Sequence, residues 1–198
     1  HVGDAYAAVI AETAAQAQDA VDAISADIIE LQAIVDMATS LAGDGFLHDE
    51  IETNQCFDWC WIEDNRAATD AAIKAAPHVT TLSLVNNRLV TNAMESRVSA
   101  ANYDPGTGDY TLYTTSQNPH LTRFLICAFV LGIPENKLRV FSPDVSGGFG
   151  SKIYHYGEEA LVLAAAKKLC RPVKWTASRS ESFLTDAHGR DHVTKIEL

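Results

Sequence analysis

A glycine-rich turn between an apolar strand and a helix constrains this chain more than any other feature. The turn covers residues 142–152 and reads Ser-Pro-Asp-Val-Ser-Gly-Gly-Phe-Gly-Ser-Lys. Because Gly147, Gly148 and Gly150 lack a Cβ atom, the backbone there can adopt positive φ and approach a bulky anionic ligand closely. Phe149 stands at the tip, and the first amides of the following helix can face a phosphate or an oxyanion. The turn therefore has the features of a cofactor-contacting loop.

Glycine content alone does not separate a ligand site from a structural turn. Glycine clusters between a strand and a helix are more often plain backbone geometry. The spacing also matches neither the G-x-x-x-x-G-K-[ST] phosphate loop nor the G-x-G-x-x-G dinucleotide pattern. Both interpretations stay open at this point.

Three further segments narrow the choice. Residues 92–95 read Asn-Ala-Met-Glu, residues 115–120 read Thr-Ser-Gln-Asn-Pro-His, and residues 171–175 read Arg-Pro-Val-Lys-Trp. In this order, and with the glycine-rich turn, they resemble the molybdenum-binding large subunits of the xanthine dehydrogenase and aldehyde oxidase family. The likeness is greatest to aerobic carbon monoxide dehydrogenases and their relatives, and it covers most of residues 80–198.

The resemblance implies roles for individual residues. The family's glutamine in this motif, at Gln117 here, hydrogen-bonds an oxo ligand of molybdenum, so Gln117 is expected to be catalytic and to bind the cofactor. Phe149 is also expected to be catalytic, with its backbone near the metal and its ring lining the substrate channel. Gly147, Gly148 and Gly150 are expected on the pterin side, and no side chain of this chain is expected to ligate the metal.

Two observations leave alternatives to these roles. Without the resemblance, Gln117 is as well explained as an amide that stabilises a turn, and Phe149 as a packed core ring. Ser146 also stands where the family pattern has the first glycine of a triplet. If φ is positive at that position, serine strains the loop by about 1 kcal/mol or more.

The resemblance further implies a cofactor, partner subunits and a reaction. The cofactor is expected to be molybdenum-molybdopterin in its cytosine dinucleotide form, and it carries the redox chemistry. A medium FAD subunit and a small 2Fe-2S subunit are expected as partners, in a dimer of heterotrimers. The implied reaction is oxidation of carbon monoxide, or a similar small substrate, with water as the oxygen source. An aldehyde or N-heterocycle hydroxylase and a truncated, non-catalytic remnant remain as alternatives.

Composition excludes several other classes of protein. The formal net charge of -11 argues against nucleic acid, whose phosphates require a basic face. No run approaches the roughly 18 apolar residues of a membrane span, and the start lacks a signal peptide's basic and apolar regions, so a cytoplasmic protein is expected. The chain begins without methionine and ends in a strand-like segment at Leu198, which suggests a fragment. The resemblance implies that the general base lies beyond Leu198.

The cysteines and histidines predict no metal site. His188 and His192 are four residues apart, but a glycine separates them in strand-like sequence. Cys127 and Cys170 lie among apolar residues and are expected to be core thiols. The four cysteines contain no C-x-x-C pair: Cys56, Cys60, Cys127 and Cys170. Glu95 is expected to pair with a nearby arginine rather than to act chemically.

Patterning predicts an α+β protein in two parts joined by a linker. Residues 1–38 read as a strand at 5–11, a helix that starts with a capping-box pattern at 13–16 and runs to about residue 24, and a strand near 27–31. They resemble the C-terminal part of an α/β hammerhead domain. Residues 39–55 have little periodicity and read as the linker. Residues 56–198 are expected to form the first, incomplete part of a molybdenum-cofactor-binding domain.

Within this last part, turn and capping signals divide the chain into elements. Strands are expected at 56–62, 97–103, 110–115, 138–141, 173–176 and 193–198, and helices at 66–76, 119–131 and 155–169. The turn at 104–109 joins two of these strands into a hairpin.

Overall fold

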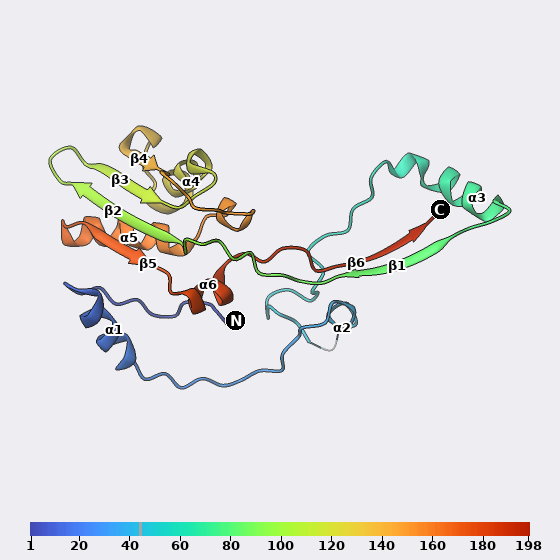
Figure 1. Ribbon diagram of the computed structural model, residues 1–198, viewed down its shortest axis with the longest axis horizontal. Coiled ribbons are helices and arrows are strands. Elements are labelled where there is room, and N and C mark those ends of the chain that lie inside the picture. The colour runs from blue at the N-terminus through green and yellow to red at the C-terminus, as the bar shows by residue number, and fades with distance from the viewer. Residues whose placement is uncertain (44) are drawn as a thin grey trace. The chain divides into compact units, whose positions relative to one another are not determined.

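The computed structural model describes residues 1–43 and 45–198 (Figure 1). It divides the chain into two compact units. The larger unit comprises residues 1–21 and 83–194, and the smaller unit comprises residues 22–82 and 195–198. The mixed α+β class expected from the sequence is confirmed.

The larger unit is built on a four-stranded mixed sheet in the order β4-β3-β2-β5. The strands are β2 (Val98–Asp104), β3 (Asp109–Thr114), β4 (Leu138–Phe141) and β5 (Val173–Thr176). β2 pairs antiparallel with β3 and with β5, whereas β3 and β4 run parallel. The expected hairpin is therefore confirmed, and β4 agrees with the sequence prediction at both ends.

Helix α5 (Gly157–Leu169) packs against β2, β3 and β5 and supplies much of the core (Figure 1). Alternate residues of the strands point toward this helix, as the two-residue period of a strand requires. Leu112 of β3 and Leu163 of α5 are both fully buried in the cluster that results. The cluster is completed by Ala101, Tyr110, Ile126, Cys127, Leu138, Val162 and Ala166.

The segment between β3 and β4 begins as helix α4 (Pro119–Leu125) and continues as a π-helical turn (Ile126–Leu131). It ends at Gly132, whose φ of 61° closes the segment in the left-handed region. The expected boundaries of this helix are confirmed. Asn118 precedes the helix but makes no side-chain cap; instead its N–H donates to the Ser116 hydroxyl.

Two further helices belong mainly to the larger unit. α1 (Ala14–Asp22) follows the predicted capping box, in which Thr13 and Gln16 bond each other. α6 (Arg179–Thr185) was not predicted. The Ser178 hydroxyl accepts from the Glu181 N–H, and the Glu181 carboxylate accepts from the Ser178 N–H. This Ser-x-x-Glu capping box is visible in the sequence and is the signal that could have located the helix.

The smaller unit contains helices α2 (Met37–Leu41) and α3 (Arg66–Ala75). α3 confirms the helix expected at 66–76. The side chain of Asn54 closes a loop here, since it donates to the carbonyls of Ser40 and Gly45 and accepts from Leu47 N–H. No side chain described in this unit is buried.

β1 (Thr81–Asn86) and β6 (His192–Glu197) form a separate two-stranded sheet. By contrast, the strands expected at 5–11, 27–31 and 56–62 are wrong, because the structure shows no strand in these segments. Their apolar and aromatic composition favours a strand, but a strand forms only when a partner satisfies its backbone N–H and C=O groups. The hammerhead assignment for residues 1–38 therefore stays a prediction.

Candidate cofactor-contacting site

The parallel pairing of β3 and β4 brings the two most informative motifs to one edge of the sheet. Gln117 lies just beyond the end of β3, and the glycine-rich loop follows the end of β4. Because parallel strands end at the same edge, the segments that follow them become neighbours there. The structure thus brings together Gln117, Gly147, Gly148, Phe149 and Gly150, although 25 residues or more separate Gln117 from the loop in the sequence.

The loop has an unusual run of positive φ angles. Ser146 has φ 51°, Gly147 φ 95°, Phe149 φ 50° and Gly150 φ 93°. The glycines tolerate such angles, whereas Ser146 and Phe149 are strained by about 1–2 kcal/mol each. Because φ is positive at Ser146, the strain expected from the sequence for a serine at this position is present. A glycine, as in the family pattern, would relieve it.

Gln117 holds the end of this loop through one side-chain atom. Its Oε1 accepts from Gly150 N–H at 3.1 Å and from Lys152 N–H at 3.3 Å, and its own N–H donates to the Lys152 carbonyl at 2.8 Å. Backbone N–H groups can only donate, so the atom that faces them must be the amide oxygen. The two N–H groups of Nε2 are thereby left for another acceptor, and within the described part of the chain they have none.

Close packing at Gly148 explains why this position has no side chain. A Cβ atom there would lie 2.2 Å from Oε1 and 2.4 Å from Cδ of Gln117. The glutamine amide therefore occupies the space that any other residue at position 148 would fill.

Phe149 is an exposed tip and not a core ring, since 72% of its surface is accessible. Within the described ranges, the backbone N–H groups of Gly147, Gly148 and Phe149 donate to no protein acceptor. Together with the Gln117 amide, they make a cluster of unpaired N–H donors beside an exposed aromatic ring. Such donors suit an oxygen-rich anionic group.

A family model of the molybdopterin cofactor-binding domain matches residues 47–198 of this chain. The chain belongs to this family.

Relatives of the domain are large subunits of molybdenum enzymes. The chain is 34% identical to the carbon monoxide dehydrogenase large chain of Hydrogenophaga pseudoflava, over 97% of this chain and 25% of that protein. It is 30% identical to the nicotine 6-hydroxylase large subunit of Paenarthrobacter nicotinovorans, over 100% of this chain and 24% of that protein. Quinoline 2-oxidoreductase from Pseudomonas putida 86 superimposes with a TM-score of 0.82 at 28% identity, covering 94% of this chain and 23% of that one. The chain thus spans about a quarter of the length of these relatives.

The donor cluster fits the ligand class of a molybdopterin cofactor-binding domain. Molybdopterin carries phosphate and other acceptor atoms, and the unpaired groups at Gln117 and in the loop are all donors. No competing carboxylate bonds to Gln117 or to Gly147, Gly148 and Phe149 among the described residues. The residues present are therefore compatible with the cofactor.

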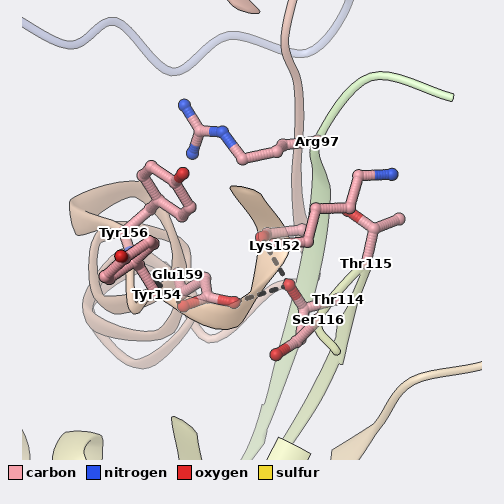
Figure 2. A pocket seen from close by; sticks show the side chains of 9 residues that line it. Arg97, Thr114, Thr115, Ser116, Lys152, Tyr154, Tyr156 and Glu159 are labelled. Carbon is pink, nitrogen blue, oxygen red and sulfur yellow. Dashed lines mark hydrogen bonds between the residues drawn. The ribbon is translucent and has the colours of Figure 1, made fainter. Parts of the chain in front are cut away.

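A small polar cavity lies behind the loop of the domain (Figure 2). Inside it, the Thr114 hydroxyl donates to the Glu159 carboxylate at 2.7 Å and lies 3.3 Å from the Ser99 hydroxyl. The His155 ring nitrogen Nδ1 lies 2.7 Å from the same carboxylate. The cavity volume of about 10 Å³ suits a single water molecule and is far too small for a cofactor. The cavity therefore does not hold the cofactor, although Ser116 and Lys152, which line it, neighbour Gln117 and the glycine loop.

Arg97, which also lines this cavity, is the centre of a buried ion-pair network. It is only 5% exposed, donates to Asp186 at 2.6 Å and to Glu158 at 3.0 Å, and stacks over the Tyr156 ring at 3.7 Å. Burial alone would lower the pKa of Arg97, but the hydrogen bonds that it donates to Glu158 and Asp186 raise it above its usual range. The ion pair expected for Glu95 is not among the ion pairs of the described residues: Arg97 pairs with Glu158 and Asp186, and Arg88 pairs with Asp191.

The remaining predicted residues lie apart from the donor cluster. The described residues contain no group of three or more His, Cys, Asp or Glu side chains that could hold a metal ion. His188 accepts from Arg88 at 2.6 Å through Nδ1, and His120 is exposed on α4. Cys127 is buried as expected. Cys170 is exposed at the end of α5, so its assignment as a core thiol is wrong: its φ of 50° serves the helix terminus.

None of the described helices is long and apolar enough to span a membrane.

The sequence assigned no role to Lys152, although this lysine ends the glycine-rich turn. In the structure its backbone bonds to Gln117.

Proposed function

We propose that this chain supplies the Gln117 and glycine-loop side of the molybdopterin site in a molybdenum hydroxylase large subunit. The observation that carries the proposal is the fixed orientation of the Gln117 amide. Its oxygen is held by two loop N–H groups, at 3.1 and 3.3 Å, so its exposed Nε2 donors remain free, within the described chain, to bond a ligand. The bound cofactor would supply the redox chemistry by accepting two electrons from the substrate.

The residues of this chain would bind the cofactor and orient it at the reacting centre. Gln117 Nε2 donates to an oxygen at the reacting centre, where a preorganised donor stabilises developing negative charge. Gly147 and Gly148 let the backbone N–H groups approach the pterin side, with Gly150 closing the turn. The exposed ring of Phe149 lines the substrate channel and excludes water from the reacting atoms.

We propose carbon monoxide, or a similarly small molecule, as the substrate and water as the oxygen source. The relative at 34% identity, a carbon monoxide dehydrogenase large chain, supports this choice. An N-heterocycle or aldehyde substrate is the second candidate, and it is supported by the nicotine 6-hydroxylase and quinoline 2-oxidoreductase relatives. Oxidation of quinoline or nicotine with no turnover of carbon monoxide would favour the second candidate.

The assembly follows the same analogy. The cofactor would be the cytosine dinucleotide form, and electrons would pass to a medium FAD subunit and a small 2Fe-2S subunit in a dimer of heterotrimers. Residues 1–38 would be the end of a hammerhead domain, and residues 39–55 a linker. The cytoplasmic location expected from the sequence stays a prediction.

A pair of Gln117 variants in the full-length, assembled protein tests the proposal. Gln117→Glu keeps an oxygen acceptor for the Gly150 and Lys152 N–H groups but removes the Nε2 donors, whereas Gln117→Ala removes both. If the donors act on the reaction, Gln117→Glu lowers turnover per bound molybdenum by about 10²-fold, the loss typical of one removed transition-state donor. The measurement is steady-state turnover divided by the molybdenum content of each preparation.

Gln55→Glu is the matched control, since Gln55 is an exposed amide in the smaller unit. Its turnover should equal that of the wild type. Equal turnover in Gln117→Glu would remove the assigned role. A wild-type protein that contains neither molybdenum nor pterin would instead favour the non-catalytic remnant.

A further inference from the structure

Lys152 is the largest side chain that is almost fully buried, with only 2% of its surface exposed. Lysine is rarely buried to this extent unless its ammonium group has partners, because an unpaired charge is costly away from water. The contacts of this ammonium group therefore indicate what holds the residue in place.

The ammonium group bonds to backbone carbonyls and not to a carboxylate. Nζ donates to the Val145 carbonyl at 2.8 Å and to the Glu95 carbonyl at 2.9 Å. No carboxylate of the described chain lies within ion-pair distance of it. Burial lowers the pKa of Lys152, and the charges of Glu95 and Asp186 only partly oppose that effect. The two bonds from Nζ to the Val145 and Glu95 carbonyls are charge-assisted hydrogen bonds, which hold the backbone more firmly than neutral ones do.

The backbone of the same residue completes a link to Gln117. Lys152 N–H donates to Gln117 Oε1, and its carbonyl accepts from Gln117 N–H at 2.8 Å. One residue thus joins three segments that are distant in sequence. They are the segment before β2 at Glu95, the segment after β3 at Gln117, and the start of the glycine loop at Val145.

We propose that Lys152 is a positioning residue that fixes the glycine loop against Gln117. The loop holds strained positive φ angles at Ser146 and Phe149, and such conformations persist only when surrounding contacts impose them. Lys152 imposes the start of the loop through Val145 and its end through the Gln117 carboxamide. The consequence for the cofactor rests on the proposed function, whereas the effect on the loop does not.

An apolar side chain of similar length would fill the space of Lys152 but would donate no hydrogen bonds to the Val145 and Glu95 carbonyls. Methionine at position 152 would leave the Val145 and Glu95 carbonyls buried without their donor, while the contact of Lys152 N–H with Gln117 could still form. Lys152→Met therefore removes the hydrogen bonds of Nζ while it keeps the packing of the side chain. Lys168→Met is the matched control, because Lys168 is exposed in the last turn of α5.

The test uses hydrogen exchange on the full-length, assembled protein. In Lys152→Met we expect the amides of Gly150 and position 152 to exchange at least about tenfold faster than in the wild type, because local opening of the loop becomes easier. Core amides of β2 and β3 should change by less than about threefold. Lys168→Met should match the wild type in both regions.

Unchanged loop exchange in Lys152→Met would overturn the proposal, and so would equal acceleration in loop and core, which would indicate a merely structural role. If Lys152→Met does not fold, Lys152→Arg replaces it: this variant keeps a cationic donor but lengthens it. An intact core with a faster loop then supports positioning, and an unchanged loop contradicts it.

A second readout connects the loop to the cofactor. In the assembled protein, Lys152→Met should retain less molybdenum and pterin after gel filtration than the Lys168→Met control, with the folded fraction equal. If molybdenum and pterin are retained equally although the loop exchanges faster, Lys152 positions the loop, but this positioning does not affect cofactor binding. Should the wild type contain no molybdenum, the proposed function fails while the exchange experiment still tests Lys152.

Discussion

The two units of this chain differ in what keeps their elements in place. The larger unit has a continuous core, in which Leu112 and Leu163 are fully buried and Arg97 is satisfied by two carboxylates. In the smaller unit no described side chain is buried, and its tryptophans Trp59 and Trp61 are 65% and 71% exposed. The comparison teaches that a similar apolar composition produces a stable arrangement only where pairing strands and a covering helix bring the residues together.

The largest expected effect on the larger unit is the loss of Arg97. Arg97→Met removes the partner of Asp186 and Glu158 and leaves buried negative charge uncompensated, which typically destabilises a protein by about 3–5 kcal/mol. Chemical denaturation of the full-length protein measures this loss. In the smaller unit, Arg66→Met breaks an exposed pair with Glu63 and should leave the denaturation midpoint unchanged. Equal effects of the two variants would contradict the contrast between the units.

Core truncation is the second test. Leu112→Ala creates a cavity at a fully buried position and should cost about 2–5 kcal/mol. Leu82→Ala, at a position 49% exposed, should change stability by less than about 0.5 kcal/mol. Thermal unfolding of both variants, followed by circular dichroism, gives the comparison. A large loss for Leu82→Ala would mean that the smaller unit has a core of its own.

A smaller effect of opposite sign is expected in the glycine loop. Ser146→Gly replaces a residue with φ 51° by one without a Cβ atom and should stabilise the protein by about 1 kcal/mol. Ala164→Gly, at an exposed position in the interior of α5, should instead destabilise by about 0.5–1 kcal/mol, because glycine loses more backbone entropy in a helix. Differential scanning calorimetry gives both signs. A lower melting temperature for Ser146→Gly would show that the serine side chain compensates the strain.

The smallest effect concerns thiol reactivity and needs no mutation. Cys56 is exposed, whereas the hydrogen bond to Glu63 raises the pKa of Cys60, and burial raises the pKa of Cys127. Because the thiolate is the reactive form, iodoacetamide at neutral pH should modify the exposed thiols of Cys56 and Cys170 first, Cys60 more slowly and Cys127 only after unfolding. Peptide mass spectrometry over time gives the order. Early modification of Cys127 would indicate that the core of the larger unit opens readily.

The sequence predicted the elements whose signals are local. The turn at 104–109 identified the β2–β3 hairpin, and β4, the strand that enters the glycine-rich turn, was predicted with its correct bounds. The strands expected at 5–11 and 56–62 failed because a strand depends on a partner that composition does not specify. α6 was missed although its Ser-x-x-Glu capping box is a local signal.

The candidate site likewise contains residues that the sequence could identify and contacts that it could not. Gln117 and the glycine loop could be named from their motifs, but their contact depends on the parallel pairing of β3 with β4, which no local pattern specifies. The roles of Lys152 and Arg97 were likewise hidden, because each depends on partners 57 to 89 residues away in the chain. Long-range contacts therefore account for most of what was not predicted.

The interlock between Gly148 and Gln117 has a consequence for how such proteins can diverge. A side chain at position 148 would need the space of the glutamine amide, since a Cβ atom would come within 2.2 Å of its oxygen. A residue other than glycine at position 148 therefore requires the Gln117 side chain to move or to be shorter, whereas a shorter residue at position 117 leaves Gly148 in place. A descendant with a new residue at 148 should accordingly carry a shorter one at 117.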